Sequence, residues 1–167
     1  MWIEKSANIV QEIKTENYDA AIHGCNCFNT MNSGVAKSIK DAFPEVEEAD
    51  RKTKKGSYNK LGTYTSAILP NPLGFKIYNL YSQYNYGYDK KVYANKIAIQ
   101  LGLEKISRDL GENKRVIMPW IGCGRGGLQD NDLLFALHES GMLAFHNITI
   151  CIKPDSYMDI EHKSTQR

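Results

Sequence analysis

The sequence lacks the cysteine patterns that define two classes of protein. Its 167 residues hold only four cysteines, too few for the disulfide framework of a small secreted domain. Cys25 and Cys27 lie two residues apart, so on a strand they would face the same side, a spacing that rarely gives an unstrained disulfide. No C-x-x-C or H-x-x-x-H spacing marks a zinc site. We therefore expect reduced thiols and no bound metal.

Long apolar runs and a large excess of one charge are also missing. No apolar run approaches the length of a membrane span, and the first residues are too charged for a signal peptide. The 21 basic and 19 acidic side chains nearly cancel, which argues weakly against a nucleic-acid binder that works through bulk charge. Basic residues gather only in residues 51–60, which we interpret as a solvated helix end and loop, with a nucleic-acid contact as the alternative. We expect a monomeric, cytoplasmic protein without a membrane partner.

What the sequence contains is an alternation of strand-like and helix-like segments, which predicts an α/β sheet covered on both faces. Helical spacing predicts helices that begin after Gly34, near Lys90 and near Asp130, and Pro44 is expected to kink or restart the first. The breaker PNPLG predicts an antiparallel hairpin between the third and fourth strands. We expect residues 1–154 to form one domain and residues 155–167 a polar tail. The expected strands are 2–3, 20–23, 62–69, 75–82, 115–121 and 147–153.

The predicted strand at 20–23 runs into a loop of small polar residues, HGCNCFNTMNSG. In α/β sheets ligands sit beyond the carboxyl ends of the strands, so this segment is a candidate site. A helix that begins at Ser33 and Gly34 would point its free N–H groups into the loop and suit a phosphate. The alternative is simply a capped helix, with Asn32 or Ser33 as the cap.

A second glycine-bearing loop, IGCGRGGLQ at residues 121–129, follows another buried strand. Its four glycines let backbone N–H groups approach a ligand, although tight turns also collect glycine. Two such loops at one edge of the sheet would hold a diphosphate from both sides. No Gly-Lys-Ser/Thr ending and no G-x-G-x-x-G after the first strand occur, so a P-loop site and a Rossmann nicotinamide site are disfavoured.

Five segments together resemble the macrodomain family of ADP-ribose-binding proteins. They are ANIV, DAAIHGCNCFNTMNSGVAKSI, LGTYTSAI, KIYNLYSQ and MPWIGCGRGGL, in the family's order and spacing. The resemblance implies a three-layer α/β/α fold with a central mixed β-sheet and no cofactor. The pattern IHGCNC…SGVA…FPEVE is particularly similar to the branch of ADP-ribose 1″-phosphate phosphatases and terminal ADP-ribose protein glycohydrolases. It implies ADP-ribose or ADP-ribose 1″-phosphate as the partner.

The resemblance also implies roles for individual residues. Asn8 stands where many macrodomains carry an aspartate that binds the adenine amino group, and Ile9 would offer its backbone N–H to the same ring. Asn26 matches an asparagine that contacts the distal ribose. The implied ligand-binding residues are Ala7, Asn8, Ile9, Gly24, Cys25, Asn26, Met31, Asn32, Ser33, Gly34, Val35, Ala36, Ile121, Gly122, Cys123, Gly124, Arg125, Gly126 and Gly127.

Catalysis is assigned by the resemblance to His23, which stands where the phosphatase branch carries a histidine implicated in catalysis. The alternative is a structural histidine in the pocket wall. Ala36 stands where one glycohydrolase branch has an aspartate, and Gln83 and Gly126 stand where the terminal ADP-ribose glycohydrolases have their catalytic lysine and aspartate. We expect a phosphatase that converts ADP-ribose 1″-phosphate to ADP-ribose and phosphate. A non-catalytic ADP-ribose-binding module, or a hydrolase that removes ADP-ribose from modified proteins, is the alternative.

Other reactive side chains near the two loops receive weaker assignments. Arg125, between glycines, is expected to clamp a terminal phosphate, with a solvent-exposed orientation as the alternative. Cys25, Cys27 and Cys123 are expected to line the pocket, with a Cys–His nucleophile as the less favoured interpretation. The tyrosines around residues 84–88 are expected to pack, with one of them covering the ribose as the alternative.

Overall fold

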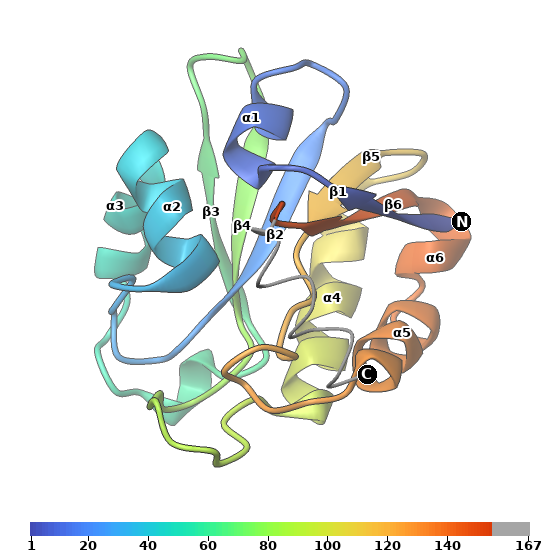
Figure 1. The fold of residues 1–167 in the computed structure, drawn as a ribbon. Helices are drawn as coiled ribbons and strands as arrows, with labels where there is room; N and C mark the ends of the chain where they lie inside the picture. The colour runs from blue at the N-terminus through green and yellow to red at the C-terminus, as the bar shows by residue number, and fades with distance from the viewer. Residues whose placement is uncertain (155–167) are drawn as a thin grey trace.

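The computed structural model describes residues 1–154 and shows strands that alternate with helices (Figure 1). The strands are β1 (Trp2–Ser6), β2 (Ala20–Cys25), β3 (Tyr64–Ile68), β4 (Lys76–Tyr81), β5 (Arg115–Met118) and β6 (Asn147–Ile152). The helices are α1 (Ile9–Ile13), α2 (Gly34–Ala42), α3 (Glu45–Arg51), α4 (Lys96–Leu110), α5 (Asp130–Glu139) and α6 (Met142–Phe145), with a 3-10 turn, η1, at Tyr58–Lys60. All the predicted strands are therefore present. The predicted polar tail, residues 155–167, lies outside the described residues.

The strands form one mixed sheet in the order β1-β6-β5-β2-β4-β3. The neighbouring strands are parallel except β3 and β4, which are antiparallel as predicted. Side chains of β2 alternate between two apolar clusters, with Ala20 and Ile22 in one and Ala21 and Cys25 in the other. The first cluster lies under α4, α5 and α6, and the second under α1, α2 and α3. The sheet is thus covered on both faces, and the fold is a three-layer α/β/α arrangement (Figure 1).

The two central strands β2 and β5 send the chain to opposite faces of the sheet. β2 leads to α2 on one face, whereas β5 leads to α5 on the other. Because β2 and β5 are paired in parallel, their carboxyl ends lie side by side. The crossover direction therefore reverses between them, and open α/β sheets bind ligands at such a point.

The helices differ from the sequence prediction in three places. α4 begins at Lys96 rather than near Lys90, because the Asn95 side chain caps it by accepting the N–H of Ala98 (2.9 Å). α1 and α6, with five and four residues, are too short to show helical periodicity in the sequence. Pro44 restarts the chain as α3 directly after α2, as predicted. Across residues 1–154, no helix combines the length and apolar character needed to cross a membrane.

Candidate functional site

The two glycine-bearing loops meet over the carboxyl ends of β2 and β5. Together with the segment that follows β4, they line a cleft of about 640 Å³. None of the residues that line this cleft within residues 1–154 is an aspartate, a glutamate or a histidine. The lining residues are Gly24, Cys25, Asn26, Thr30, Asn32, Ser33, Gly34, Val35, Ala36, Ser82, Gln83, Tyr86, Gly87, Tyr88, Pro119, Trp120, Ile121, Gly122, Gly124, Arg125 and Gly126.

One wall of the cleft is the first turn of α2. Ser33 occupies the N-cap position, but its side chain makes no capping hydrogen bond. The backbone N–H groups of Gly34, Val35 and Ala36 have no acceptor among the described residues. The positive end of the helix dipole lies at the same turn. This wall therefore offers a set of unpaired donors instead of the side-chain-capped helix that the sequence left as the alternative.

The opposite wall is the loop at residues 121–127. The loop is closed by the N–H of Leu128, which donates to the carbonyl of Gly122 (2.9 Å). The backbone N–H groups of residues 124–126 find no acceptor within residues 1–154. At Gly126 a Cβ would lie 2.5 Å from the carbonyl oxygen of Gly122, so a side chain would force this loop to move. The second wall is thus also made of backbone donors, and it is sterically closed to side chains at Gly126.

A protein from a bacteriophage is similar to the chain in sequence. No family model matches the chain. The chain is 40% identical over 111 residues to the "Uncharacterized 17.5 kDa protein in tk-vs intergenic region" of Enterobacteria phage T4, a match that covers 62% of this chain and 68% of the phage protein. The chain belongs to the family of this phage protein.

Solved structures match most of the chain in fold. The macrodomain of Mycobacterium tuberculosis DarG is 20% identical, with a TM-score of 0.68 over 93% of this chain and 99% of that one. Thermosipho africanus DarTG, solved in complex with ADP-ribose, is 16% identical, with a TM-score of 0.60 over 87% of this chain and 41% of that one. The fold is the macrodomain fold.

The macrodomain cleft carries one guanidinium within the described chain, that of Arg125. Its Cζ lies 4.4 Å from the centroid of the Tyr88 ring, which is a cation–π contact. A guanidinium stacked on a ring keeps its N–H edges free for an anion. Arg125 therefore lines the cleft and stacks on Tyr88, a contact that the sequence did not predict.

His23, the predicted catalytic residue, lies in the core of the macrodomain and does not line the cleft. Its side chain is fully buried, and its Nε2 donates to Oδ1 of Asn79 (2.6 Å), because the Asn79 amide nitrogen donates to the carbonyl of Val46 (3.0 Å) and to Thr65 (3.0 Å). Burial lowers the pKa of His23 to about 4, so the ring is neutral near pH 7. The geometry fits the structural alternative and gives no support to the catalytic assignment.

The cysteine thiols near the cleft are protonated at neutral pH. Burial raises the pKa of Cys25 well above its usual value and raises that of Cys123 to about 12. Burial likewise raises the pKa of Cys27, whose thiol donates to the carbonyl of Gln83 (3.5 Å). Because the thiolate is the nucleophilic form, these thiols are poorly suited to attack. Cys25 lines the cleft, whereas Cys27 and Cys123 are not among its lining residues.

Some of the predicted ligand-binding residues lie outside the cleft lining. Met31 is buried in the core, because it packs into the apolar cluster beneath α2. Asn8 caps α1, since its Oδ1 accepts the N–H of Gln11 (3.2 Å). α1 itself packs against α2 and β5, beside the cleft. The adenine contacts of Asn8 and Ile9 stay a prediction. The predicted ligand-binding residues that do not line the cleft are Ala7, Asn8, Ile9, Met31, Cys123 and Gly127.

Asn26 lines the cleft, but its amide also holds its own loop. Its Nδ2 donates to the side chain (2.7 Å) and the carbonyl (3.2 Å) of Thr30, and its Oδ1 accepts the N–H of Phe28 (2.8 Å). Both amide hydrogens are therefore engaged within the loop. The side chain shapes this wall, and the ribose contact implied by the resemblance stays a prediction.

Sequence reasoning missed several side chains at the cleft, and Trp120 and Ser82 are two of them. Trp120 lines it while its Nε1–H donates to Glu4 (2.8 Å) and its ring meets the edge of Trp2 (centroids 5.9 Å apart). Ser82 also lines the cleft and packs closely against Gly24. A Cβ added to Gly24 would lie 2.6 Å from the serine hydroxyl oxygen. Trp120 follows the carboxyl end of β5, and Ser82 follows that of β4. The rule that ligands sit at the carboxyl ends of strands would have selected them.

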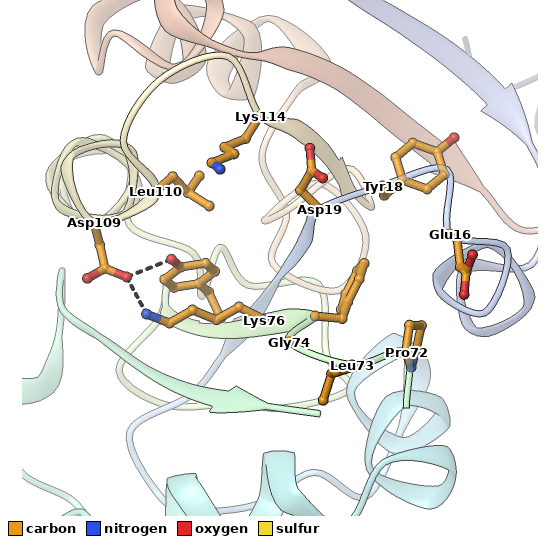
Figure 2. Close-up of a pocket in the computed structure, with 12 residues that line it drawn as sticks. Glu16, Tyr18, Asp19, Pro72, Leu73, Gly74, Lys76, Asp109, Leu110 and Lys114 are labelled. Atoms are coloured by element: carbon orange, nitrogen blue, oxygen red, sulfur yellow. Dashed lines mark hydrogen bonds and ion pairs between the residues drawn. The ribbon is translucent and has the colours of Figure 1, made fainter. Parts of the chain in front are cut away.

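A second pocket opens at the other end of the central strands, beside the amino ends of β2, β4 and β5 (Figure 2). Its volume is about 480 Å³, and we call it the opposite pocket. Figure 2 shows Asp109 bound to Lys76 (2.5 Å) and to the hydroxyl of Tyr78 (2.6 Å). Asp19 pairs with Arg115 (2.9 Å). The lining residues are Glu16, Tyr18, Asp19, Pro72, Leu73, Gly74, Phe75, Lys76, Tyr78, Asp109, Leu110 and Lys114.

Proposed function

We propose that the cleft binds ADP-ribose and that the chain is an ADP-ribose-binding module. One observation carries this proposal: two backbone walls, at residues 34–36 and 124–126, present unpaired N–H groups to one cleft. Donors on two sides suit the two linked phosphates of a diphosphate, and no carboxylate among the described lining residues would repel them. The same fold in Thermosipho africanus DarTG was solved in complex with ADP-ribose, which supports this choice of ligand.

We assign the two halves of the ligand from the surroundings of the walls. The adenosine half is assigned toward α1, where the resemblance implies that Asn8 and Ile9 meet the adenine. The distal ribose is assigned toward the segment after β4, where Gln83 and Tyr86 line the cleft. Arg125 then lies at the distal end and would favour a negative group there.

Phosphatase activity on ADP-ribose 1″-phosphate stays a prediction, and the chemistry of the cleft favours binding without turnover. General acid–base catalysis needs a side chain that reaches the reacting group and changes protonation near neutral pH. No carboxylate or imidazole lines the cleft within residues 1–154. His23 is buried and neutral, and the Cys25 thiol is protonated. The hydrolase alternative meets the same difficulty, because Gln83 and Gly126 offer no acid or base.

Calorimetric titration tests the binding proposal. We expect ADP-ribose to bind, and AMP and ribose 5-phosphate to bind at least tenfold more weakly, because each carries one phosphate and meets only one wall. A folded sample that gives no heat and no melting shift with ADP-ribose would overturn the proposal. Equal affinity for AMP and ADP-ribose would show that the two walls do not share a diphosphate.

Two turnover assays separate a binding module from an enzyme. One measures phosphate release from ADP-ribose 1″-phosphate, and the other measures label release from ADP-ribosylated protein. We expect the chain to bind in the first assay without releasing phosphate, and to release no label in the second. Phosphate release above the rate of the Gly126→Val variant would establish the phosphatase instead.

The monomeric, cytoplasmic state expected from the sequence stays a prediction. All four cysteines are free thiols, which suits a reducing compartment. Light scattering on the purified chain gives its mass in solution, and a mass above that of one chain would contradict the monomer.

A further inference from the structure

A surface outside the cleft presents an exposed, stacked tyrosine. The ring of Tyr58 in η1 lies flat on that of Tyr84, with centroids 3.6 Å apart and planes inclined by 2°. Tyr84 is held from below by the edge of Phe28 (5.0 Å) and by its hydroxyl, which donates to the carbonyl of Gly56 (2.8 Å). The outer ring is nevertheless 69% exposed. We call Phe28, Tyr58 and Tyr84 the tyrosine platform, because they hold one aromatic face rigid and open to solvent.

Unpaired lysines precede this platform in the chain. Residues 51–60 hold five basic side chains and no acidic one. Arg51 pairs with Glu47 (3.1 Å), and Lys60 is buried and donates to the carbonyl of Cys27 (3.2 Å). The other three are exposed, and no ion pair to an acidic residue of the described chain engages them; they are Lys52, Lys54 and Lys55.

One short turn joins the lysines to the platform. The N–H of Ser57 donates to the carbonyl of Lys54 (3.3 Å), and the N–H of Gly56 donates to the carbonyl of Cys27 (2.7 Å). These bonds fix the turn against the chain that carries Phe28. Lys55 is three residues before Tyr58, so their Cα atoms lie within about 11 Å of each other. The cations and the open ring are therefore neighbours on a well-tied surface.

We propose that the tyrosine platform and the three lysines bind single-stranded nucleic acid. A base stacks on the outer face of Tyr58, and the neighbouring phosphates lie on the lysine side chains. Aromatic faces beside basic side chains are the combination that binds single strands without sequence preference. A duplex keeps its base faces covered, whereas a single strand presents a flat base beside every phosphate. The near-zero net charge does not oppose a local site, because salt screens charges beyond about 10 Å.

Nothing in this proposal depends on ADP-ribose. Neither Tyr58 nor any of the three lysines lines the cleft. Gly126 does line the cleft, and it is not part of the tyrosine platform. The Gly126→Val variant is therefore expected to keep oligonucleotide binding while it loses ADP-ribose. Failure of the ADP-ribose titration and failure of the oligonucleotide titration are separate results.

Fluorescence anisotropy with a labelled oligothymidylate tests the platform. We expect the wild-type chain to bind the single strand and Tyr58→Ala to bind it about tenfold more weakly, the scale of one lost base stack. Tyr58→Trp keeps a ring, so it should retain binding, and the new indole should be quenched when the oligonucleotide is added. Phe135→Ala is the matched control, because Phe135 is an aromatic side chain of α5 with a similar exposure of 61%. It should bind as the wild type does.

Salt dependence tests the lysines. Each phosphate contact on a single strand contributes about 0.7 to the slope of log affinity against log salt concentration. Replacing Lys52, Lys54 and Lys55 by glutamine should therefore reduce that slope by about 2. A control triple with the same change in net charge replaces Lys14, Lys114 and Lys153, and it should leave the slope near that of the wild type.

Three outcomes would overturn the proposal. The first is an oligothymidylate affinity that is the same for wild type, Tyr58→Ala and the lysine triple. The second is equal binding of a duplex of the same length, with the same dependence on Tyr58. The third is Tyr58-dependent binding of an ADP-ribose oligomer by a chain that ignores oligothymidylate, which would make the partner a polymer of ADP-ribose.

Discussion

The cleft and the opposite pocket are hollows of comparable volume at the two ends of the same strands, yet their polar groups are used differently. In the opposite pocket both aspartates have partners: Asp109 accepts from Lys76 and Tyr78, and Asp19 pairs with Arg115. In the cleft the backbone donors of both walls have no acceptor within residues 1–154. The two hollows differ little in volume. They differ in whether their polar groups already have hydrogen-bond partners.

This difference indicates which hollow is built for a ligand. Polar groups that already have partners stabilise the fold and gain little from a further ligand. Donors without partners gain a full set of hydrogen bonds when an anion arrives, and the anion replaces only water. Substitutions in the cleft should therefore change affinity, and substitutions in the opposite pocket should change stability.

The largest effect is expected at Gly126, where Gly126→Val should abolish detectable binding of ADP-ribose. The valine Cβ would lie 2.5 Å from the carbonyl oxygen of Gly122 and 2.9 Å from Cβ of Ala94, so the loop must move away from its present path. Moving it displaces the donors of residues 124–126. Calorimetry measures the loss. Binding within threefold of the wild type would show that this wall does not hold the ligand.

Two matched variants accompany Gly126→Val. Gly124→Ala adds a Cβ with no heavy atom within 4 Å, so it should leave the melting temperature unchanged and show whether the loop tolerates a side chain where space exists. Lys114→Met alters the opposite pocket, where it should leave ADP-ribose affinity as in the wild type. A drop in affinity for Lys114→Met would break the contrast between the two hollows.

The next effect concerns His23, which lies beneath the cleft in the core. Its pKa is about 4 in the folded chain because burial disfavours the charged ring, against about 6.5 when unfolded. Its contribution to stability is therefore complete above pH 6.5 and is lost as the pH falls toward 4, by about 3 kcal/mol in all. His23→Gln keeps a donor for Asn79 without titrating, so its free energy of unfolding should fall less over this range.

Denaturant titrations of both proteins between pH 7 and pH 4 measure this difference. Parallel pH profiles for the wild type and His23→Gln would mean that the ring is not held neutral in the core. A His23→Gln variant that keeps its ADP-ribose affinity would agree with a core position. A loss of ADP-ribose affinity without a loss of stability would instead show that His23 takes part in ligand binding.

The sequence predicts the strands well and the site less completely, for a physical reason. Runs such as Val116 and Ile117 are local signals, and so are the glycines that mark the second wall. The position of His23 is decided by Asn79, which is 56 residues away in the chain and adjacent across β2 and β4. The stack of Arg125 on Tyr88 likewise joins two separate loops. Contacts between distant segments leave no periodic pattern, so they emerge only from the fold.

The smallest effect is expected in the opposite pocket, where Asp109→Ala should lower the free energy of unfolding by about 1 kcal/mol and leave ADP-ribose affinity unchanged. The substitution removes the acceptor of the Tyr78 hydroxyl and the partner of Lys76. Lys76 and Tyr78 hold the pKa of Asp109 below its usual range, so this stabilisation is present above about pH 4 and disappears as the pH falls further. Asp109→Asn, which keeps an acceptor, should lose less. Denaturant titrations at pH 7 and pH 3 should show a gap between wild type and Asp109→Ala that narrows in acid, and a gap of the same size at both pH values would contradict a charge-dependent stabilisation by Asp109.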